Sequence, residues 1–190
     1  MQTREHKRLS VEDYIALDRA TDERWEYVGG EAFAMAGASP RHNAIAMNIA
    51  VTLANALRNR PCFPLGSDQK VATLATGAFH YPDITVVCGK PSFAPKDEHA
   101  ITNPSVLFEV LSEGTSDYDR GEKFDHYATI PELREYVVVF SATRRIEHRK
   151  RTSDGKWLVS DAIGGEVALD ALGISLALAD VYADLDRVAG

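Results

Sequence analysis

Hydrophobic and polar positions in the first 35 residues predict a short helix followed by a β-hairpin. Residues Ser10–Asp18 have helical character, with Ser10 as the N-cap and Asp13 three residues later. Trp25–Val28 and Glu31–Met35 read as two short strands on either side of Gly29-Gly30. Two adjacent glycines supply the positive φ that a tight hairpin turn requires. We therefore expect a helix and a hairpin at the N-terminus.

The next segment has the period of a long helix. Ser39-Pro40 begins it, because proline is favoured at the first helical position, and the pattern continues to about Arg58. Its apolar stripe has i, i+4 spacing and consists of Ile45, Ile49, Leu53 and Leu57.

After Pro61 the apolar runs become short and rich in β-branched residues, which predicts strands. These runs are Ser67–Leu74, Ile84–Cys88, Val106–Leu111 and Tyr136–Phe140. The last two are apolar enough to be central strands of a sheet. A helix over Asp117–Thr129, which ends before Pro131, lies between them.

The C-terminal third predicts one more hairpin and a packed tail. Asp154-Gly155 is a strong turn signal between Arg145–Arg151 and Lys156–Ser160. The apolar tail Ala171–Leu185 is expected to pack back onto the domain. The whole pattern predicts one α/β domain over residues 1–190, with a mixed β-sheet flanked by helices.

Composition places the chain among ordinary soluble globular proteins. It has 190 residues, of which 45% are hydrophobic and 26% charged. No apolar run approaches the length of about 20 residues that spans a membrane, and the N-terminus has no apolar core of a secretory signal. Cys62 and Cys88 lack CxxC spacing, so we expect neither a disulfide scaffold nor a thiolate zinc site, and a reducing cytoplasm fits.

The net charge of −7 argues against an easy nucleic-acid interface, because phosphate binding usually leaves a basic footprint. The densest basic run extends from Arg144 to Arg151. It could contact phosphates, or it could keep an edge strand from aggregating. The chain has no Gly-rich phosphate loop, no Gly-x-Ser-x-Gly elbow and no His-Glu-x-x-His motif, which removes the common nucleotide-binding, serine-hydrolase and zinc-protease classes.

Two carboxylates are the main candidates for chemistry. Glu109 lies inside an apolar strand, where a carboxylate is costly unless it is paired or binds a metal. Asp83 follows Pro82 and opens the strand that begins at Ile84. On neighbouring strands, the two could hold a hard cation such as Mg²⁺. The alternatives are an end-of-strand glutamate that points to solvent or to an arginine, and an ordinary Pro-Asp loop.

Further candidates surround this pair. Lys123 could orient a water or stabilise charge on a phosphate, or it could be a solvated lysine. Tyr127, one turn later, could support it or belong to the core. His42 could reach the same cleft or lie on the surface, and Asp68 could point into the cleft or only begin a strand.

The ordered set of motifs resembles the Uma-two family of proposed bacterial restriction endonucleases, within the PD-(D/E)xK nuclease superfamily. The resemblance covers about residues 10–182. Its motifs are Trp25-Glu-Tyr-Val28, Gly30-Glu31, Ala38-Ser-Pro-Arg-His42, Tyr81-Pro-Asp83, Phe108-Glu109-Val-Leu-Ser112, Tyr118-Asp-Arg-Gly-Glu-Lys123-Phe and Leu133-Arg-Glu-Tyr-Val137.

The resemblance implies a restriction-endonuclease-like core and Mg²⁺-dependent (or Mn²⁺-dependent) phosphodiester hydrolysis. Asp83, Glu109 and the carbonyl of Val110 would bind the metal, and Lys123 would assist the attacking water. Glu31 and Ser112 are supporting candidates. The superfamily pattern places a lysine two residues after the second acid, where this chain has Leu111, so Lys123 on the following helix takes that part.

The leading hypothesis is therefore a metal-dependent endonuclease that acts on DNA. Because cutting both strands calls for two sites, we expect a homodimer. One alternative is a binding module that keeps the nuclease fold without turnover, motivated by the acidic charge and the missing in-strand lysine. Another is a metal-dependent hydrolase of a different phosphate ester.

Overall fold

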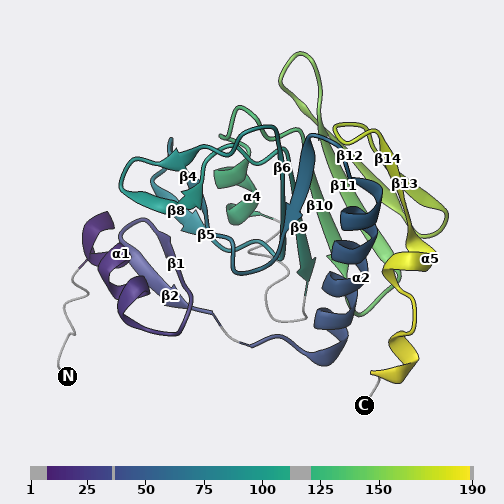
Figure 1. Cartoon of the computed structure of the whole chain (residues 1–190), viewed down its shortest axis with the longest axis horizontal. Helices are drawn as coiled ribbons and strands as arrows, with labels where there is room; N and C mark the ends of the chain where they lie inside the picture. Colours follow the sequence, from purple (N-terminus) through teal and green to yellow (C-terminus); the bar gives the residue numbers. More distant parts are fainter. Residues whose placement is uncertain (1–7, 36, 112–120, 189–190) are drawn as a thin grey trace.

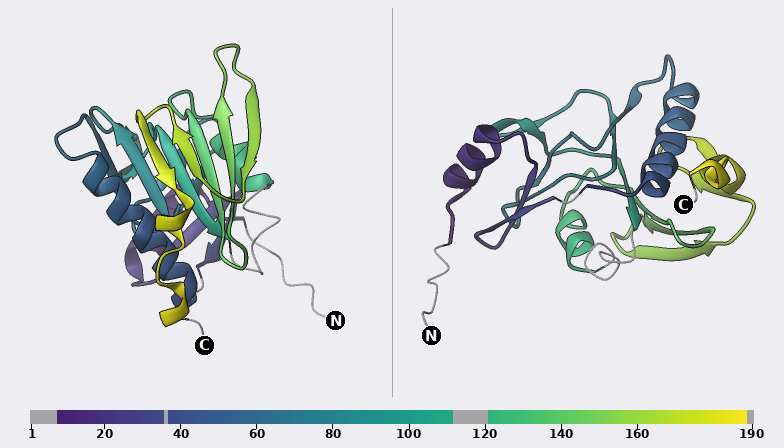
Figure 2. Two further views of the ribbon diagram at one scale, coloured as in Figure 1. Left: turned by 90° about the vertical axis from the view of Figure 1, so that its right-hand side faces the viewer. Right: turned by 90° about the horizontal axis from the view of Figure 1, so that it is seen from below.

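The computed structural model describes residues 8–35, 37–111 and 121–188. Two six-stranded mixed sheets form its centre, and helices lie on the second sheet and at the N-terminus (Figure 1). The view from below in Figure 2 separates the N-terminal helix and hairpin from the long helix and the C-terminal segment. Among the described residues, no helix is long and apolar enough to cross a membrane.

The N-terminal elements form as the sequence predicts. Helix α1 (Val11–Ala20) begins at Ser10, whose hydroxyl accepts from the Asp13 backbone N–H while Asp13 caps in return. Strands β1 (Trp25–Val28) and β2 (Glu31–Ala34) pair across Gly29 and Gly30, both of which have positive φ. The hairpin joins β5 (Ala78–His80), β4 (Val71–Thr73), β8 (Asp97–Ile101) and β7 (Phe93–Ala94) in the first sheet, in the order β2-β1-β5-β4-β8-β7.

The second sheet has the order β12-β11-β10-β9-β6-β3. Its strands are β3 (Cys62–Leu65), β6 (Ile84–Cys88), β9 (Val106–Leu111), β10 (Glu135–Phe140), β11 (Arg145–Arg151) and β12 (Trp157–Ala162). The central pair β9 and β10 is parallel, and the other neighbours are antiparallel. The expectation that β9 and β10 are central is therefore confirmed.

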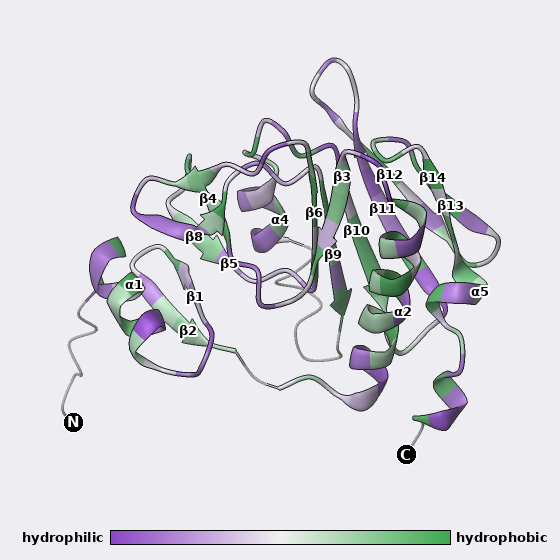
Figure 3. Cartoon of the chain, in the orientation of Figure 1, coloured by the Kyte–Doolittle hydropathy of each residue, from purple (hydrophilic) through white to green (hydrophobic). Residues whose placement is uncertain are grey.

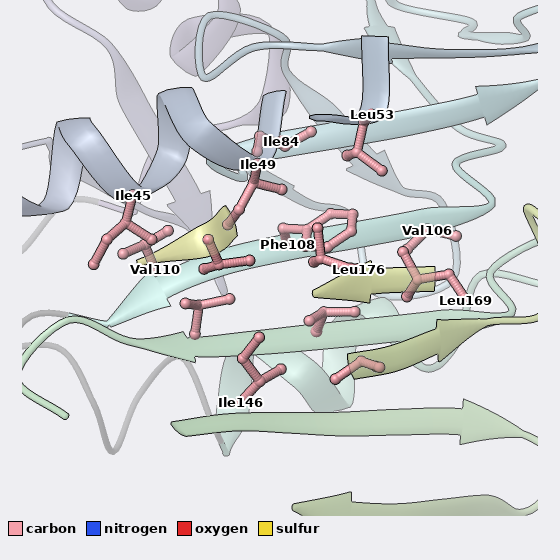
Figure 4. Packing of buried hydrophobic residues seen from close by; sticks show 14 of the residues in the cluster. Ile45, Ile49, Leu53, Ile84, Val106, Phe108, Val110, Ile146, Leu169 and Leu176 are labelled. Atoms are coloured by element: carbon pink, nitrogen blue, oxygen red, sulfur yellow. The ribbon is translucent and has the colours of Figure 1, made fainter. Parts of the chain in front are cut away.

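One face of this sheet is covered by α2 (Pro40–Ala56), and all four members of its predicted apolar stripe are buried. Figure 4 shows Ile45, Ile49 and Leu53 above Phe108 and its strand neighbours. The C-terminal elements β13 (Glu166–Leu169), β14 (Ile174–Ala177), α5 (Leu178–Val181) and η1 (Leu185–Arg187) complete the same core, so the tail packs back as expected.

The opposite face of the sheet carries α4 (Glu122–Tyr127), which packs through Tyr127 and Phe124 against Tyr136. In Figure 3, α4 carries mostly hydrophilic residues although it lies against apolar strands. The predicted start of this helix at Asp117 lies outside the described residues. Its short described part places Lys123 and Tyr127 on the buried side.

Three expectations about local structure are corrected. The strand expected over Ser67–Leu74 is only Val71–Thr73, because a turn bonded from the Gln69 N–H to the Gly66 carbonyl occupies the preceding residues. The basic run does not form an edge strand, since β11 lies between β10 and β12.

The third correction concerns the cysteines. Cys62 and Cys88 face each other across β3 and β6 and form a disulfide. The pairing was not predicted because the two cysteines are 26 residues apart in the sequence and strand β3 was itself not predicted. Unpaired thiols would have supported the expected reducing cytoplasm, and in the structure these two cysteines are oxidised.

Candidate active site

Asp83 directly precedes β6 and is held by contacts from two other elements. Strand β6 pairs with β9 so that Ile84 faces Phe108, and one further step in this register places Asp83 opposite Glu109. Asp83 Oδ2 accepts a 2.7 Å hydrogen bond from the Val110 N–H and lies 3.2 Å from His42 Nε2. The register therefore places the two acidic residues that the sequence singled out opposite each other on neighbouring strands.

His42 belongs to the site and is largely buried, rather than lying on the surface. It stands in the first turn of α2, where its N–H donates to the capping hydroxyl of Ser39. Burial alone lowers the pKa of His42, but the hydrogen bond and the charge of Asp83 outweigh it and raise the pKa above the ordinary 6.5. The imidazole thus favours its charged form when Asp83 is ionised.

Glu109 is buried and paired with a lysine from the helix that follows its strand. Lys123 Nζ lies 3.0 Å from Glu109 Oε1 and 3.0 Å from Glu26 Oε1. The Lys123 side chain is only 5% exposed, so the solvated alternative is wrong for this lysine. The strand has Leu111 two residues after Glu109, so the lysine that contacts Glu109 comes from α4 instead.

Tyr127 holds the same carboxylate from one turn further along α4. Its hydroxyl donates to Glu109 Oε1 at 3.2 Å. Burial raises the pKa of Tyr127 well above its ordinary value, and the negative charges of Glu109 and Glu26 add to this against the opposing charge of Lys123. The phenol therefore remains a neutral hydrogen-bond donor.

Glu26 is the site residue that sequence reasoning missed. It lies on β1 between Trp25 and Tyr27, and its carboxylate also accepts from the Tyr81 N–H at 3.1 Å. The available signal was the strand alternation, because Tyr27 turns into the core beside Tyr14 and Glu26 must face the other way. Nothing in the local sequence indicated that this other face meets α4.

His80 on β5 packs against Tyr127 of the same cluster. Its fully buried ring lies 5.2 Å from the Tyr127 ring and 5.5 Å from that of His126. Burial lowers the pKa of His80 well below its ordinary value, and the charges of Lys123 and His126 lower it further. A neutral imidazole therefore packs beside the lysine.

The structure does not bring every candidate into this cluster. Glu31 is exposed on β2 and, together with Phe33, borders a hollow of about 350 Å³ near Trp25. The Asp68 side chain is 93% exposed and pairs with Arg24 at 2.8 Å. Ser112 lies outside the described residues, and the Val110 contact that the structure shows is made by its N–H rather than its carbonyl.

The basic run on β11 is occupied by structural partners. Arg145 pairs with Asp161 and lies over the Phe140 ring, and Arg149 pairs with Glu147 and lies over Phe124. Arg151 donates to backbone carbonyls at the end of α4. Acidic side chains thus offset the charges of Arg145, Arg149 and Lys150, whereas the backbone carbonyls that hold Arg151 are neutral.

Asp83 and Glu109 could hold a hard divalent cation only if water or phosphate oxygens completed its coordination shell. Among the described residues, no group of three or more His, Cys, Asp or Glu side chains is arranged to hold a metal. Asp83 and Glu109, opposite each other, offer two carboxylates. This is the number with which Mg²⁺ is commonly bound when water and phosphate oxygens complete its shell.

Comparison with known proteins identifies the family of the chain. The model of the Uma2 family, described as "Putative restriction endonuclease", matches residues 11–179. Two uncharacterized proteins of Synechocystis sp. strain PCC 6803, sll1609 and slr1290, are 30% and 32% identical to the chain. The matches cover 86% and 94% of this chain and 93% of each relative.

A solved structure shows the same fold. It is a crystal structure from Anabaena variabilis ATCC 29413, described as a "putative nuclease belonging to DUF820". The TM-score is 0.76 at 14% sequence identity, over 93% of this chain and 99% of that chain. The mixed α/β, nuclease-like fold expected from the sequence is confirmed.

Proposed function

The chain belongs to the Uma2 family, and from this premise we propose that it is a metal-dependent nuclease that hydrolyses DNA phosphodiesters with Mg²⁺ or Mn²⁺. The observation that carries the proposal is the placement of Asp83 opposite Glu109, with the buried ammonium of Lys123 held 3.0 Å from Glu109. Two carboxylates on paired strands, with a lysine in contact with one of them, are groups that such hydrolysis uses.

The charges of the cluster support a requirement for a divalent cation. Asp83, Glu109 and Glu26 bring three carboxylates against the single ammonium of Lys123, which leaves a formal charge of −2 when His42 is neutral and −1 when it is protonated. A phosphodiester would be repelled by this site alone. Asp83, Glu109 and the Val110 carbonyl would hold the cation, which when bound polarises the phosphate and lowers the pKa of a water.

The chain's own side chains have separate tasks in this proposal. Lys123 donates toward the attacking water or the phosphate oxygen and offsets negative charge as it develops there. Tyr127 and Glu26 fix the positions of Glu109 and Lys123. His42 holds the Asp83 carboxylate in place until a cation competes for it. The 3.0 Å contact of Lys123 with Glu109 favours turnover over an inactive binding module.

The test compares cleavage by the wild type with that by matched carboxylate variants. Supercoiled plasmid and labelled oligonucleotides are incubated with Mg²⁺ or Mn²⁺ and wild type, Asp83→Asn, Glu109→Gln or the control Glu98→Gln. Glu98 is an exposed carboxylate on β8 outside the cluster. We expect cleavage that needs the cation, is lost in the first two variants and persists in the control. Cleavage by Asp83→Asn equal to wild type would refute the assignment.

Calorimetric titration separates the metal site from turnover. Heat of Mn²⁺ binding in the wild type that disappears in the Asp83→Asn/Glu109→Gln variant supports the site. Sedimentation of the wild type, with and without DNA, tests the proposed homodimer, since a dimer would present one site to each strand.

A further inference from the structure

An aromatic side chain stands exposed on the hairpin beside the cluster. Phe33 lies on β2, at the edge of the first sheet, and is 51% exposed. In the register of the hairpin it pairs directly with Glu26. Side chains of directly opposed residues share one face of an antiparallel pair, with Cβ atoms about 5 Å apart. Phe33 therefore borders the carboxylate that contacts Lys123.

The position of this face is fixed by the packing of the other one. Tyr27 and Ala32 turn toward α1, where the Tyr27 ring stacks on Tyr14 with centroids 4.9 Å apart. Glu26 and Phe33 consequently face away from α1, and Glu26 reaches Lys123 at 3.0 Å. The hairpin thus holds the Phe33 ring at the rim of the candidate active site.

Isolated exposed apolar residues are common and need no special cause. What distinguishes Phe33 is its direct pairing with a residue of the charged cluster while half of its side chain stays exposed. A phosphodiester bound at Lys123 would bring its flanking sugar and base to this rim. Of these groups, the base is the flat aromatic one.

We propose that Phe33 stacks on an unpaired nucleobase next to the phosphodiester bound at the Glu109–Lys123 site. This inference rests on the proposed nuclease function and names its substrate more closely. Both faces of a base inside a duplex are covered by its neighbours, so a side chain can stack only on an unpaired or extruded base. The site is thereby suited to single-stranded nucleic acid, or to a duplex that is opened locally around the phosphodiester to be cut on each strand.

The experiment measures binding without turnover. Fluorescence anisotropy follows a labelled 12-nucleotide single-stranded DNA, the matching blunt duplex and an RNA of the same sequence, with Ca²⁺ in place of Mg²⁺ to slow hydrolysis. The variants are Phe33→Ala, Phe33→Trp and the control Phe93→Ala. Phe93 is 50% exposed on β7, at the other edge of the same sheet.

Phe33→Ala is expected to weaken single-strand binding between about 5-fold and about 150-fold, the range for loss of one stacked base. Phe33→Trp and Phe93→Ala are expected to bind like the wild type, and duplex binding should be weak and insensitive to Phe33. The RNA arm shows whether stacking serves both sugars. Equal single-strand binding by Phe33→Ala and wild type would overturn the stacking inference alone. A wild type that binds none of the three probes would overturn the proposed function with it.

Discussion

Replacement of Lys123 by methionine tests the charge balance on which the proposed site depends. The ammonium lies 3.0 Å from both Glu26 and Glu109, and all three side chains are largely buried. Methionine fills similar space but leaves the two carboxylates to face each other without that charge. Removal of one partner from a buried ion pair costs about 3–5 kcal/mol. We expect the free energy of unfolding, measured by urea titration at pH 7, to fall by this amount.

The loss should depend on pH in a definite direction. Without Lys123, the two buried carboxylates repel each other when both are ionised, and a proton on one of them relieves this repulsion in the folded state. The folded variant then binds more protons than the unfolded chain, so its stability falls as pH rises, by up to about 1.4 kcal/mol per pH unit for one proton. The variant should therefore be closest to the wild type near pH 5 and furthest from it at pH 7 and above.

Two further variants make the result specific. Glu26→Gln in the Lys123→Met background removes one of the facing charges and should restore part of the lost stability. Lys96→Met removes a lysine from an exposed pair with Glu12 and should change little. A Lys123→Met variant as stable as the wild type at both pH values would show that the cluster does not depend on this ammonium.

Four other outcomes follow from the same structure. In the metal-free protein, the His42 pKa measured by NMR should be lower in Asp83→Asn than in the wild type, because the hydrogen bond and the charge of Asp83 no longer act against burial. In the wild type, the stabilising His42–Asp83 contact is complete below the unfolded pKa and is lost as pH rises through the raised folded value, which the pH dependence of urea unfolding checks. Substitution of both Cys62 and Cys88 by serine opens a link across 26 residues and should cost about 3 kcal/mol in non-reducing urea unfolding, with no such loss if the thiols are free. Ile49→Ala, at the fully buried centre of α2, should cost about 2–5 kcal/mol, and a smaller loss would mean that the core closes around the gap.

Much of the fold was predictable because its elements carry local signals. The Ser10 and Ser39 caps, the two hairpin turns and the i, i+4 stripe of α2 act within a few residues of one another. The missed strands lack such signals. Strand β3 contains Pro64, which removes a backbone donor, and it is tolerated because β3 lies at a sheet edge. Strands β5 and β7 are only three and two residues long, too short to show a period.

The candidate site was predictable only in part, for a related reason. Glu109 is conspicuous because its strand neighbours are all apolar, and Asp83 because proline precedes it. Glu26 lies as close to the Lys123 ammonium as Glu109 does, yet in the sequence it resembles any outward-facing residue of a strand. Conversely, Glu31 was favoured by motif position, and the register of the hairpin leaves it exposed at the sheet edge.

The position of Lys123 explains how the chain can place a lysine at Glu109 without one in the strand. Leu111, two residues after Glu109, is buried with Tyr127 and Tyr136 in the core beneath α4. That core fixes α4, and α4 in turn delivers the ammonium to Glu109 and Glu26. The charge at the site thus depends on packing of the helix rather than on spacing within the strand. Because the hairpin supplies Glu26 and α2 supplies His42, the cluster is complete only when the hairpin, α2 and α4 have all packed beside the β6–β9 pair.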